Sequence, residues 1–360
     1  MNRLIPTLSR SRTPSLRVLP LPRLQLRHNS TDHRWRGISE QDSLFAKDEK
    51  RPKWLLPSLA LVSVLVVGTN GYIYYTSPEL RNRVPPLEYG EFNQFPLMEV
   101  IPVTHDTSLF RFRAAHQFPD SQSKTNRSNK NEIVLSTNEY VPAPNHIVIK
   151  DDSCQVGRSY TPITYGRNHF DLLVKRYDNG SVSSMIHALK PGEDFILARG
   201  PILSFPYTEN MASEVVMIAG GTGITPMYQL IKQILRSPTD NTKINLVYGS
   251  RTESDILLGH ELELLSTKFP DQLRVNHVIQ APTGALAGFG FEVKHTGLIN
   301  ENVLKACGMP KPDEEPLVLV CGPDGMIDAL AGEKPSERNQ GTLKGVLARM
   351  GFSPQQVFKF

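Results

Sequence analysis

One short stretch of the chain, RSYTPIT, combines residue types that bind phosphates and flat heterocyclic rings. It places Arg158, Tyr160, Thr161 and Thr164 around Pro162. The forked guanidinium of an arginine suits a pyrophosphate, a tyrosine ring can lie on a flat heterocycle, and threonine hydroxyls are short hydrogen-bond donors. Taken alone, the stretch is better explained as an edge strand with ordinary turn chemistry, so it identifies a site only together with other motifs.

A second stretch, VVMIAGGTGITPM, has the order of strand, glycine-rich turn and helix that a dinucleotide site requires. Gly220, Gly221 and Gly223 lack Cβ atoms, so the phosphates of a ligand can approach the backbone. Pro226 suits the first turn of the helix, whose free N–H groups and partial positive charge attract an anion. The pattern favours dinucleotide binding over a merely tight turn, although Pro226 stands at the last position of the usual G-x-G-x-x-G fingerprint.

A third stretch, LVCGPDGM, is a strand that ends in Cys321, Gly322 and Pro323 before a helix. Ligands of parallel sheets sit at the carboxyl ends of strands, near the point where the strand order reverses. Cys321 can therefore face the ligand crevice, but small buried cysteines are common, and the sequence leaves both interpretations open. The three cysteines are odd in number and widely spaced, so we expect neither a disulfide framework nor a metal site.

The elements that must position these motifs fall into two domains with different patterns of secondary structure. From 97 to 207, short alternating runs rich in β-branched and aromatic residues predict an antiparallel β-barrel. The segment at 181–189 is its only candidate helix. From 213 to 360, strands and helices alternate, which predicts an α/β domain with a doubly wound parallel sheet. A proline-punctuated linker at 76–96 precedes both domains.

The first helix of the α/β domain is predicted to begin at Pro226, because apolar residues recur on one helical face after it. These residues are Met227, Leu230, Ile231, Ile234 and Leu235. Further helices are predicted over 253–269 and 341–351, and a terminal strand over 356–360.

The first 31 residues carry six arginines and no acidic residue. This composition, with serine, leucine and proline, is typical of a mitochondrial targeting segment, and a disordered basic tail is the alternative. Without those six arginines the formal net charge of +4 becomes −2. A slightly acidic folded part argues against nucleic acid as a partner.

Residues 54–75 carry no charged side chain, and at ~1.5 Å per residue a helix of this length crosses a hydrocarbon layer of ~30 Å. Trp54 opens the segment and Tyr72, Tyr74 and Tyr75 close it, as in an aromatic belt. We expect one transmembrane helix here, with a buried core helix as the alternative. With the leader, it predicts the mitochondrial inner membrane, with the large domain facing the intermembrane space. The mitochondrial outer membrane is the second choice.

In combination, the three motifs in this order, followed by a C-terminal Phe-Lys-Phe, resemble the ferredoxin–NADP reductase superfamily. Within it, residues 97–360 are most similar to the NADH–cytochrome b5 reductases, especially fungal mitochondrial membrane-anchored forms. The resemblance implies FAD as the resident cofactor and NADH or NADPH as the electron donor, with no metal. It also implies hydride transfer from nicotinamide to flavin, with Thr164 and Cys321 nearest the reacting rings.

The resemblance assigns cofactor-binding roles to individual positions. Those on the flavin side are Arg158, Tyr160, Thr161, Pro162, Thr164, Gly180 and Ser183, with Lys175 and Ile147 beside either ring. Those on the nicotinamide-nucleotide side are Gly221, Thr222, Gly223, Thr225, Pro226, Arg251, Gly322, Pro323 and Phe360. We expect His105, His146 and His187 to be structural or surface residues rather than catalysts.

Three features depart from the pattern of that family. Val182 stands where a methionine is usual, and Asp324 puts a charge near the mouth of the cofactor site. The acid that usually rejects a 2′-phosphate is absent, since the strand end reads Ile279 and Gln280. With Arg251 nearby, NADPH stays open beside NADH, because lost repulsion changes specificity.

The sequence therefore predicts a membrane-anchored mitochondrial FAD-dependent oxidoreductase that passes electrons from NAD(P)H to a one-electron haem-protein acceptor such as cytochrome b5. The alternative is an FAD-containing assembly factor that assists haem reduction and attachment to cytochrome c in the intermembrane space, with the cytochrome c and haem lyase system as its partner. The departures at Val182, Ile279 and Asp324 keep this alternative open.

Overall fold

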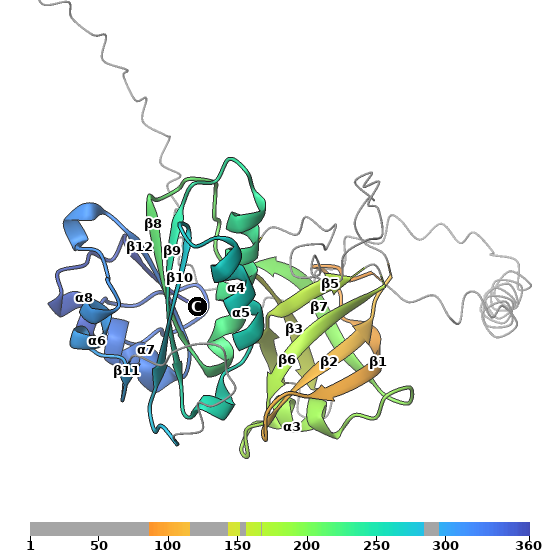
Figure 1. Cartoon of the computed structure of the whole chain (residues 1–360). Coiled ribbons are helices and arrows are strands. Elements are labelled where there is room, and N and C mark those ends of the chain that lie inside the picture. The colour runs from red at the N-terminus through yellow and green to blue at the C-terminus, as the bar shows by residue number, and fades with distance from the viewer. Residues whose placement is uncertain (1–85, 116–142, 152–155, 167, 284–294) are drawn as a thin grey trace, which may run out of the picture. The chain divides into compact units, whose positions relative to one another are not determined.

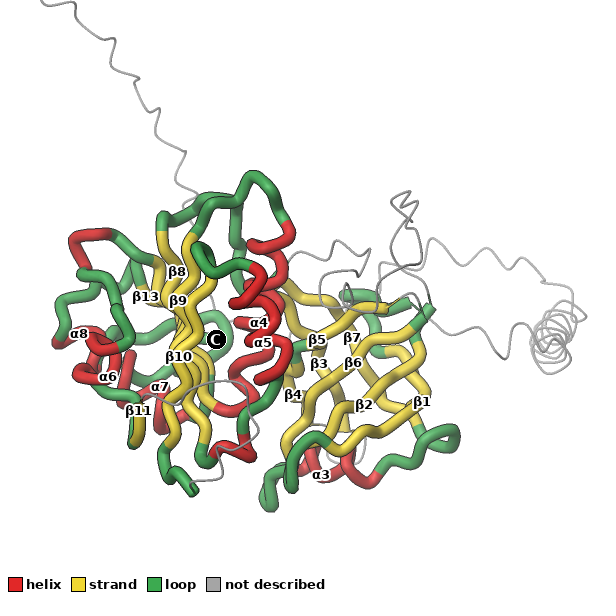
Figure 2. The backbone as a smooth tube through the Cα atoms, in the orientation of Figure 1, coloured by secondary structure: helices red, strands yellow, loops and turns green. Residues whose placement is uncertain are grey.

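The structure is a computed structural model, and its elements are drawn in Figure 1 and as a tube in Figure 2. It describes residues 86–115, 143–151, 156–166, 168–283 and 295–360, all within one compact unit that spans 73–360. The predicted targeting segment, the predicted transmembrane helix and the linker up to residue 85 lie outside the described residues. Within the described residues, every helix is too short or too polar to cross a membrane.

The first part of the described chain is an antiparallel sheet of seven strands in the order β4-β3-β7-β1-β2-β6-β5. The strands are β1 (Asn93–Pro102), β2 (Thr107–Arg113), β3 (Asn145–Asp151), β4 (Val156–Tyr160), β5 (Pro162–Gly166), β6 (His169–Lys175) and β7 (Phe195–Leu203). The Tyr165 hydroxyl on β5 donates a hydrogen bond to Oδ1 of Asn145 on β3, although four strands separate β3 from β5 in the sheet. The sheet therefore curls round on itself as a barrel does, in agreement with the predicted antiparallel architecture.

Alternation of apolar side chains builds the core of this sheet. Along β3, Ile147 and Ile149 are fully buried while Val148 between them is half-buried. The rings of Phe95 and Phe170 meet edge to face inside, with their centroids 5.4 Å apart. The predicted helix is present as α3 (Ser181–Ala188), and its Val182 packs into this same core. Ile147 thus serves the core, where it has no exposed surface.

The second part is a parallel sheet of six strands in the order β11-β10-β9-β8-β12-β13. The strands are β8 (Glu214–Gly220), β9 (Lys243–Ser250), β10 (Leu273–Ile279), β11 (His295–Thr296), β12 (Leu317–Cys321) and β13 (Val357–Lys359). The helices between them are α4 (Ile224–Arg236), α5 (Gly259–Lys268), α6 (Glu301–Ala306), α7 (Asp324–Ala331) and α8 (Gly345–Arg349).

Helices cover both faces of this sheet, as Figure 1 shows. Val215 and Met217 of β8 pack in one core cluster with residues of α4 and α5. Val216 and Ile218, which point the other way, pack with residues of α6, α7 and α8. A strand buried on both faces reads as a continuous apolar run, so the predicted doubly wound sheet is confirmed.

Three predicted helix boundaries were wrong. The helix predicted from Pro226 begins two residues earlier, at Ile224. The helix predicted over 253–269 is a single 3₁₀ turn at Glu253–Asp255 followed by α5, because Leu258 takes a left-handed conformation (φ +57°) that no α-helix continues through. The helix predicted over 341–351 covers only α8, since Lys344 before it is extended.

Candidate active site

The strand order of the parallel sheet reverses at β8. β8 pairs with β9 on one side and with β12 on the other, and Cys321 at the end of β12 lies opposite Ala219 of β8. The glycine-rich turn and the Cys-Gly-Pro stretch are therefore neighbours at one edge of the sheet. Ligands of such sheets bind outside the carboxyl ends of the strands at this switch point.

Two glycines of the turn are needed for different reasons. Gly221 has a positive φ of +52°, and nothing lies within 4 Å of where a Cβ atom would be, so its open side faces outward. A Cβ atom at Gly223 would instead clash with the backbone carbonyl of Cys321. Gly221 thus leaves room for an approaching ligand, whereas Gly223 lets the turn pack against the end of β12. This cradle fits the diphosphate of a nicotinamide nucleotide.

We expect Gly223→Ala to lower the free energy of unfolding by about 2 kcal/mol, because the added methyl group meets rigid backbone. Gly221→Ala should cost about 1 kcal/mol, since only its left-handed conformation is strained. Urea denaturation of the two variants beside the wild type measures both values. Equal losses in the two variants would contradict the packing role assigned to Gly223.

Buried hydroxyl groups hold the turn in place. The Tyr248 hydroxyl donates to the carbonyl oxygen of Gly221 at 3.1 Å and accepts from the amide of Leu257 at 3.1 Å. Burial raises the pKa of Tyr248 to about 12, so the donor stays protonated. Thr225 is also buried, and its hydroxyl donates to the carbonyl oxygen of Thr222 at 3.0 Å. Tyr248 was not predicted from the sequence, because a tyrosine in an apolar strand is an ordinary core residue.

The predicted flavin-side residues begin on β4, an edge strand of the antiparallel sheet. Arg158 is exposed, and its Nη1 contacts only the neighbouring carbonyl oxygen of Gly157, at 3.0 Å, among the hydrogen bonds of the described residues. Tyr160 is half-buried against the core of the sheet. Burial raises the pKa of Tyr160 to about 12, although Arg158 opposes the shift. A neutral phenol and a projecting guanidinium thus lie two residues apart on one strand.

α3 contacts β4, the strand that carries Arg158. Gly180 is the residue before the helix, and a Cβ atom there would crowd the Ser183 hydroxyl. Ser183 accepts from the amide of Tyr177 at 3.3 Å and donates to the carbonyl oxygen of Gly180 at 3.2 Å. The free N–H groups of the first turn of α3 and the Arg158 guanidinium on β4 are the two groups in this part of the sheet whose chemistry suits a pyrophosphate. Val182, the departure from the family pattern, points into the core instead.

The rest of the RSYTPIT motif is Thr161, which joins β4 to β5, and the first residues of β5. Thr161 and Thr164 are half-buried, whereas Pro162 is buried. Thr164 pairs with Asp171 of β6, whose carboxylate binds both Nε and Nη2 of Arg111 at 2.8 and 3.0 Å. This bidentate pair fixes the backbone beside Thr164 without using the threonine hydroxyl, which stays free to serve as the predicted donor.

Lys175 ends β6, a strand that lies against the glycine-rich turn. Its Nζ is 2.8 Å from Oδ2 of Asp106, and the hydroxyls of Thr104 and Thr107 donate to the other oxygen of that carboxylate. Burial raises the pKa of Asp106, but these hydrogen bonds outweigh it and lower the pKa overall. In the described structure Lys175 is thus paired with Asp106. The role of Lys175 beside a cofactor ring stays a prediction.

One group of potential metal ligands occurs within the described residues. His105, Asp106 and Asp255 place ligand atoms within 4.8 Å of one another. The His105 imidazole lies between the two carboxylates, 3.4 Å from Asp106 and 3.6 Å from Asp255. Since Lys175 already supplies a positive charge to Asp106, we assign no metal to this group.

Cys321 ends β12 and Phe360 follows β13, and both strands lie on the side of β8 opposite to β9. Cys321 is half-buried, and burial raises the pKa of its thiol to about 12. The thiol therefore stays neutral and cannot act as a thiolate nucleophile. The Phe360 amide donates to Val320 at 2.9 Å, and its ring meets Phe358 edge to face at 5.1 Å. These groups form a neutral, partly apolar wall beside Gly322 and Pro323, suited to a flat ring.

The carboxyl ends of β9 and β10 carry the residues expected near the second ribose of a nucleotide. The Gln280 and Ala281 amides donate to the carbonyl oxygens of Ser250 and Arg251, at 2.9 and 2.8 Å. Arg251 and Gln280 are both exposed, whereas Ile279 is fully buried. Ile279, Gln280 and Ala281 carry no acidic side chain at the end of β10, and the acid that follows β9, Glu253, is fully buried and binds Thr283.

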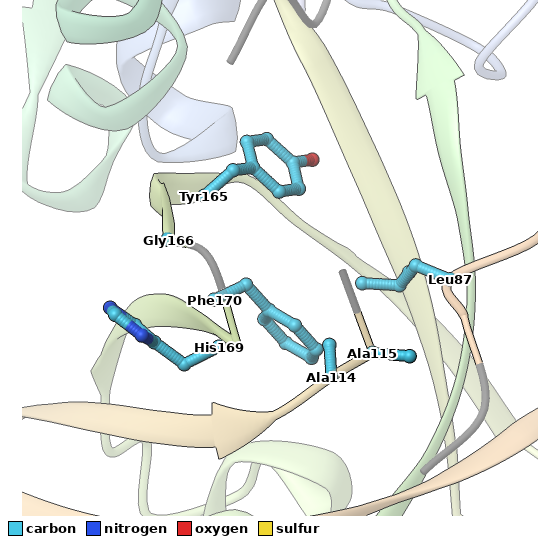
Figure 3. Close-up of a pocket in the computed structure, with 7 residues that line it drawn as sticks. All are labelled: Leu87, Ala114, Ala115, Tyr165, Gly166, His169 and Phe170. Carbon is cyan, nitrogen blue, oxygen red and sulfur yellow. The ribbon is translucent and has the colours of Figure 1, made fainter. Parts of the chain in front are cut away.

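One pocket is lined by other residues, which Figure 3 shows. Its walls come from the start of the described chain and from the ends of β2, β5 and β6, and include Leu87, Tyr165, His169 and Phe170. None of the predicted site residues lines it. We therefore place the active site on the cradle of β8 and β12 and on the strands β4 and β5, not in this pocket.

Two family models match the chain. The oxidoreductase FAD-binding domain covers residues 127–207, and the oxidoreductase NAD-binding domain covers residues 217–331. The FAD-binding match contains β4, β5 and α3, and the NAD-binding match contains the glycine-rich turn and the end of β12.

Curated relatives are similar to most of the chain. NADH-cytochrome b5 reductase 2 of Neurospora crassa is 37% identical over 267 residues, 73% of this chain and 71% of that protein. NADH-cytochrome b5 reductase 2 of Debaryomyces hansenii is 34% identical over 299 residues, 82% of this chain and 92% of that protein.

Solved structures share the fold. The cytochrome b5 reductase domain of Ulva prolifera nitrate reductase is 30% identical, with a TM-score of 0.59, and covers 77% of this chain and 100% of its own. The CS-b5R domains of human Ncb5or, in their NAD+ form, are 21% identical with a TM-score of 0.52, and cover 75% of this chain and 69% of their own.

Proposed function

Because this chain belongs to the NADH-cytochrome b5 reductase family, we propose that it passes electrons from NADH or NADPH through FAD to a one-electron haem-protein acceptor. It is an NAD(P)H-dependent flavin oxidoreductase with FAD-binding and NAD-binding domains. The observation that carries the proposal is the contact of β6 with the glycine-rich turn, which brings the sheet with the RSYTPIT motif against the nucleotide cradle.

Each side chain has a definite task in this proposal. Arg158 and the first turn of α3 bind the pyrophosphate of FAD, and Tyr160 covers its ring with a neutral phenol. The Thr164 hydroxyl donates a hydrogen bond toward the reactive edge. When bound, FAD accepts a hydride and releases its electrons one at a time. The neutral thiol of Cys321 and the ring of Phe360 exclude water from the nicotinamide.

We infer the electron acceptor from the names of the relatives and not from a contact in the structure. These relatives are named for the reduction of cytochrome b5, so we take cytochrome b5 or a similar haem protein as the partner. The alternative, an assembly factor for haem attachment to cytochrome c, is not favoured by these names. Its main sequence support weakens as well, since Val182 and Ile279 are buried core residues and do not reshape the site.

The acceptor is tested by stopped-flow mixing of the NADH-reduced protein with oxidised cytochrome b5 or with cytochrome c. We expect cytochrome b5 to reoxidise the flavin at least about tenfold faster than cytochrome c does. The reason is that electrostatic complementarity between a reductase and its own acceptor speeds their association, and cytochrome c is not the acceptor in this proposal. Faster reoxidation by cytochrome c, or by free haem, would favour the assembly factor instead.

We further infer a membrane anchor at 54–75, in the mitochondrial inner membrane with the reductase domains in the intermembrane space. The support is the apolar, charge-free sequence of that segment and the arginine-rich leader before it. The outer membrane is the second choice. Protease added to intact mitochondria should leave the reductase domains uncut, and rupture of the outer membrane should expose them.

Nucleotide preference depends on Arg251 and Gln280. We expect Arg251→Ala to raise the KM for NADPH by about tenfold and to leave the KM for NADH within twofold, because only the 2′-phosphate needs the cation. Gln280→Asp should have the same selective effect through repulsion. Steady-state kinetics with both nucleotides measure it. An equal change in both KM values would show that Arg251 does not face the 2′ position.

A further inference from the structure

One polar side chain of α4 forms hydrogen bonds to the antiparallel sheet through both its amide oxygen and its amide nitrogen. Gln229 is only 6% exposed. Its Oε1 accepts from the amide of Asn145 at 2.8 Å, and its Nε2 donates to the carbonyl oxygen of Pro162 at 2.6 Å. Both atoms of the amide group are thus used, one on β3 and one on β5. Buried amides paired in this way hold their partners in one geometry.

One of the two backbone groups that Gln229 binds, the Pro162 carbonyl, belongs to the predicted flavin site. Pro162 lies between Thr161 and Thr164 in the RSYTPIT motif. Asn145 is tied to the same strand, because its side chain accepts a hydrogen bond from Tyr165. Hydrogen bonds therefore link α4, β3 and β5 in a closed ring, and β5 is the strand that carries Thr164.

A second side chain of α4 binds the next carbonyl group of the same strand. One helical turn on, Lys232 donates from Nζ to the carbonyl oxygen of Ile163 at 2.6 Å. Ile163 packs in the same core cluster as Ile224 and Met227 of α4. Consecutive carbonyl groups of β5, at positions 162 and 163, are thus both bound by side chains from one helix.

The N-terminus of α4 adjoins the nucleotide cradle. The helix begins directly after the Gly221–Gly223 turn, and Gln229 stands six residues beyond Gly223. At ~1.5 Å per residue, these groups are about 9 Å apart along a rigid helix. The helix therefore connects the turn that would hold the nicotinamide nucleotide directly to the strand that would hold the flavin.

We infer that Gln229 is a positioning residue for hydride transfer, which sets where β5 and its flavin stand relative to the nicotinamide on the glycine-rich turn. It acts through Pro162 and Asn145 and touches neither ring. This inference rests on the proposed function. A displacement of about 1 Å between reacting groups can lower a rate by about 100-fold, so loss of the bridge should affect chemistry more than binding.

The decisive variant is Gln229→Met, which keeps the length of the side chain and removes both hydrogen-bonding groups. In anaerobic stopped-flow mixing with saturating NADH, we expect flavin reduction at least about tenfold slower than in the wild type. FAD content and the KM for NADH should stay within about twofold. The long-wavelength absorbance of stacked flavin and nicotinamide rings should weaken, a signature that a purely structural loss would not produce.

Gln233→Met is the matched control. Gln233 lies one turn further along the same helix and accepts a single hydrogen bond from the amide of Ala143 at 2.6 Å, away from β5. It should reduce flavin at the wild-type rate. Wild-type reduction in Gln229→Met, or an equal slowing in both variants, would overturn the inference. A wild-type protein that NADH does not reduce would overturn the proposed function as well, and is a distinguishable result.

Gln229→Glu tests the same idea through pH. A protonated carboxyl donates to Pro162 and accepts from Asn145 as the amide does, whereas the carboxylate meets the Pro162 oxygen without a proton between them. A buried glutamate titrates as high as about pH 8–9, so reduction in this variant should accelerate as the pH falls from about 9 to about 6. Tyr165, Tyr228 and Lys232 face the same region, so the pH profile of the variant is compared with that of the wild type, which keeps all three.

A further readout needs no cofactor turnover. Exchange of the Asn145 amide proton, followed by NMR, should be at least about tenfold faster in Gln229→Met than in the wild type, because its acceptor is gone. In Gln233→Met the same amide should exchange at the wild-type rate. Unchanged exchange at Asn145 in Gln229→Met would show that the bridge does not exist in solution.

Discussion

Arg158→Ala is expected to weaken FAD binding by about 100-fold, so that the purified protein loses its yellow colour during gel filtration. The guanidinium is exposed on β4, a strand that α3 contacts, and within the described residues its one hydrogen bond is to the carbonyl oxygen of Gly157. Two charge-assisted hydrogen bonds to a pyrophosphate account for about 3 kcal/mol, which equals that fold-change. Fluorescence titration of the apoprotein with FAD measures the Kd.

Two further variants separate charge from geometry. Arg158→Lys keeps the charge but not the fork, and should weaken FAD binding by about tenfold. Arg113→Ala removes an exposed arginine at the end of β2, outside the predicted site, and should leave the Kd unchanged. Wild-type affinity in Arg158→Ala would place the pyrophosphate elsewhere and remove the main support for the flavin side of the site.

Acid should destabilise the protein through His277, a buried residue of β10. Burial lowers the pKa of His277 to about 4 from an ordinary value near 6.5. Above pH 6.5 the imidazole is neutral in the folded and unfolded states, so it contributes no pH dependence. As the pH falls, the unfolded chain binds the proton first, and folding loses about 2 kcal/mol at pH 5 and about 3 kcal/mol at pH 4.

His277→Gln removes the titrating group and should flatten this part of the stability profile. The difference in free energy of unfolding between wild type and variant, measured by urea denaturation from pH 7.5 to pH 5, isolates His277 from other titrating residues. His260→Gln, at an exposed position on α5, is the control and should follow the wild type. Parallel profiles for wild type and His277→Gln would show that His277 is already protonated or solvated in the folded protein.

The parts of the fold that sequence reasoning predicted depend on local patterns. Continuous apolar runs and glycine-rich turns indicated a doubly wound sheet, and the motifs at Gly221 and Cys321 indicated which strand ends meet. Both follow from rules that act over a few residues. The helix limits around Leu258 and Lys344 were missed, because a left-handed residue and an extended one leave no mark in the apolar pattern.

The contacts that position the site could not be predicted in the same way. Gln229 and Asn145 are 84 residues apart in the chain, and a glutamine within a helix gives no signal of its partner. The only indication is that Gln229 falls among residues buried all round α4, where a polar side chain needs partners. Val182 was expected to mark a modified cofactor turn, but its periodicity in α3 makes it a core residue.

The central claim is that one chain holds FAD and receives a hydride from a nicotinamide nucleotide. The most direct test is the flavin absorbance of the FAD-loaded protein after anaerobic mixing with a slight excess of NADH. We predict complete bleaching of the yellow colour within seconds, with NADH consumed one for one with FAD. A protein that binds FAD but remains yellow with both NADH and NADPH would contradict the account.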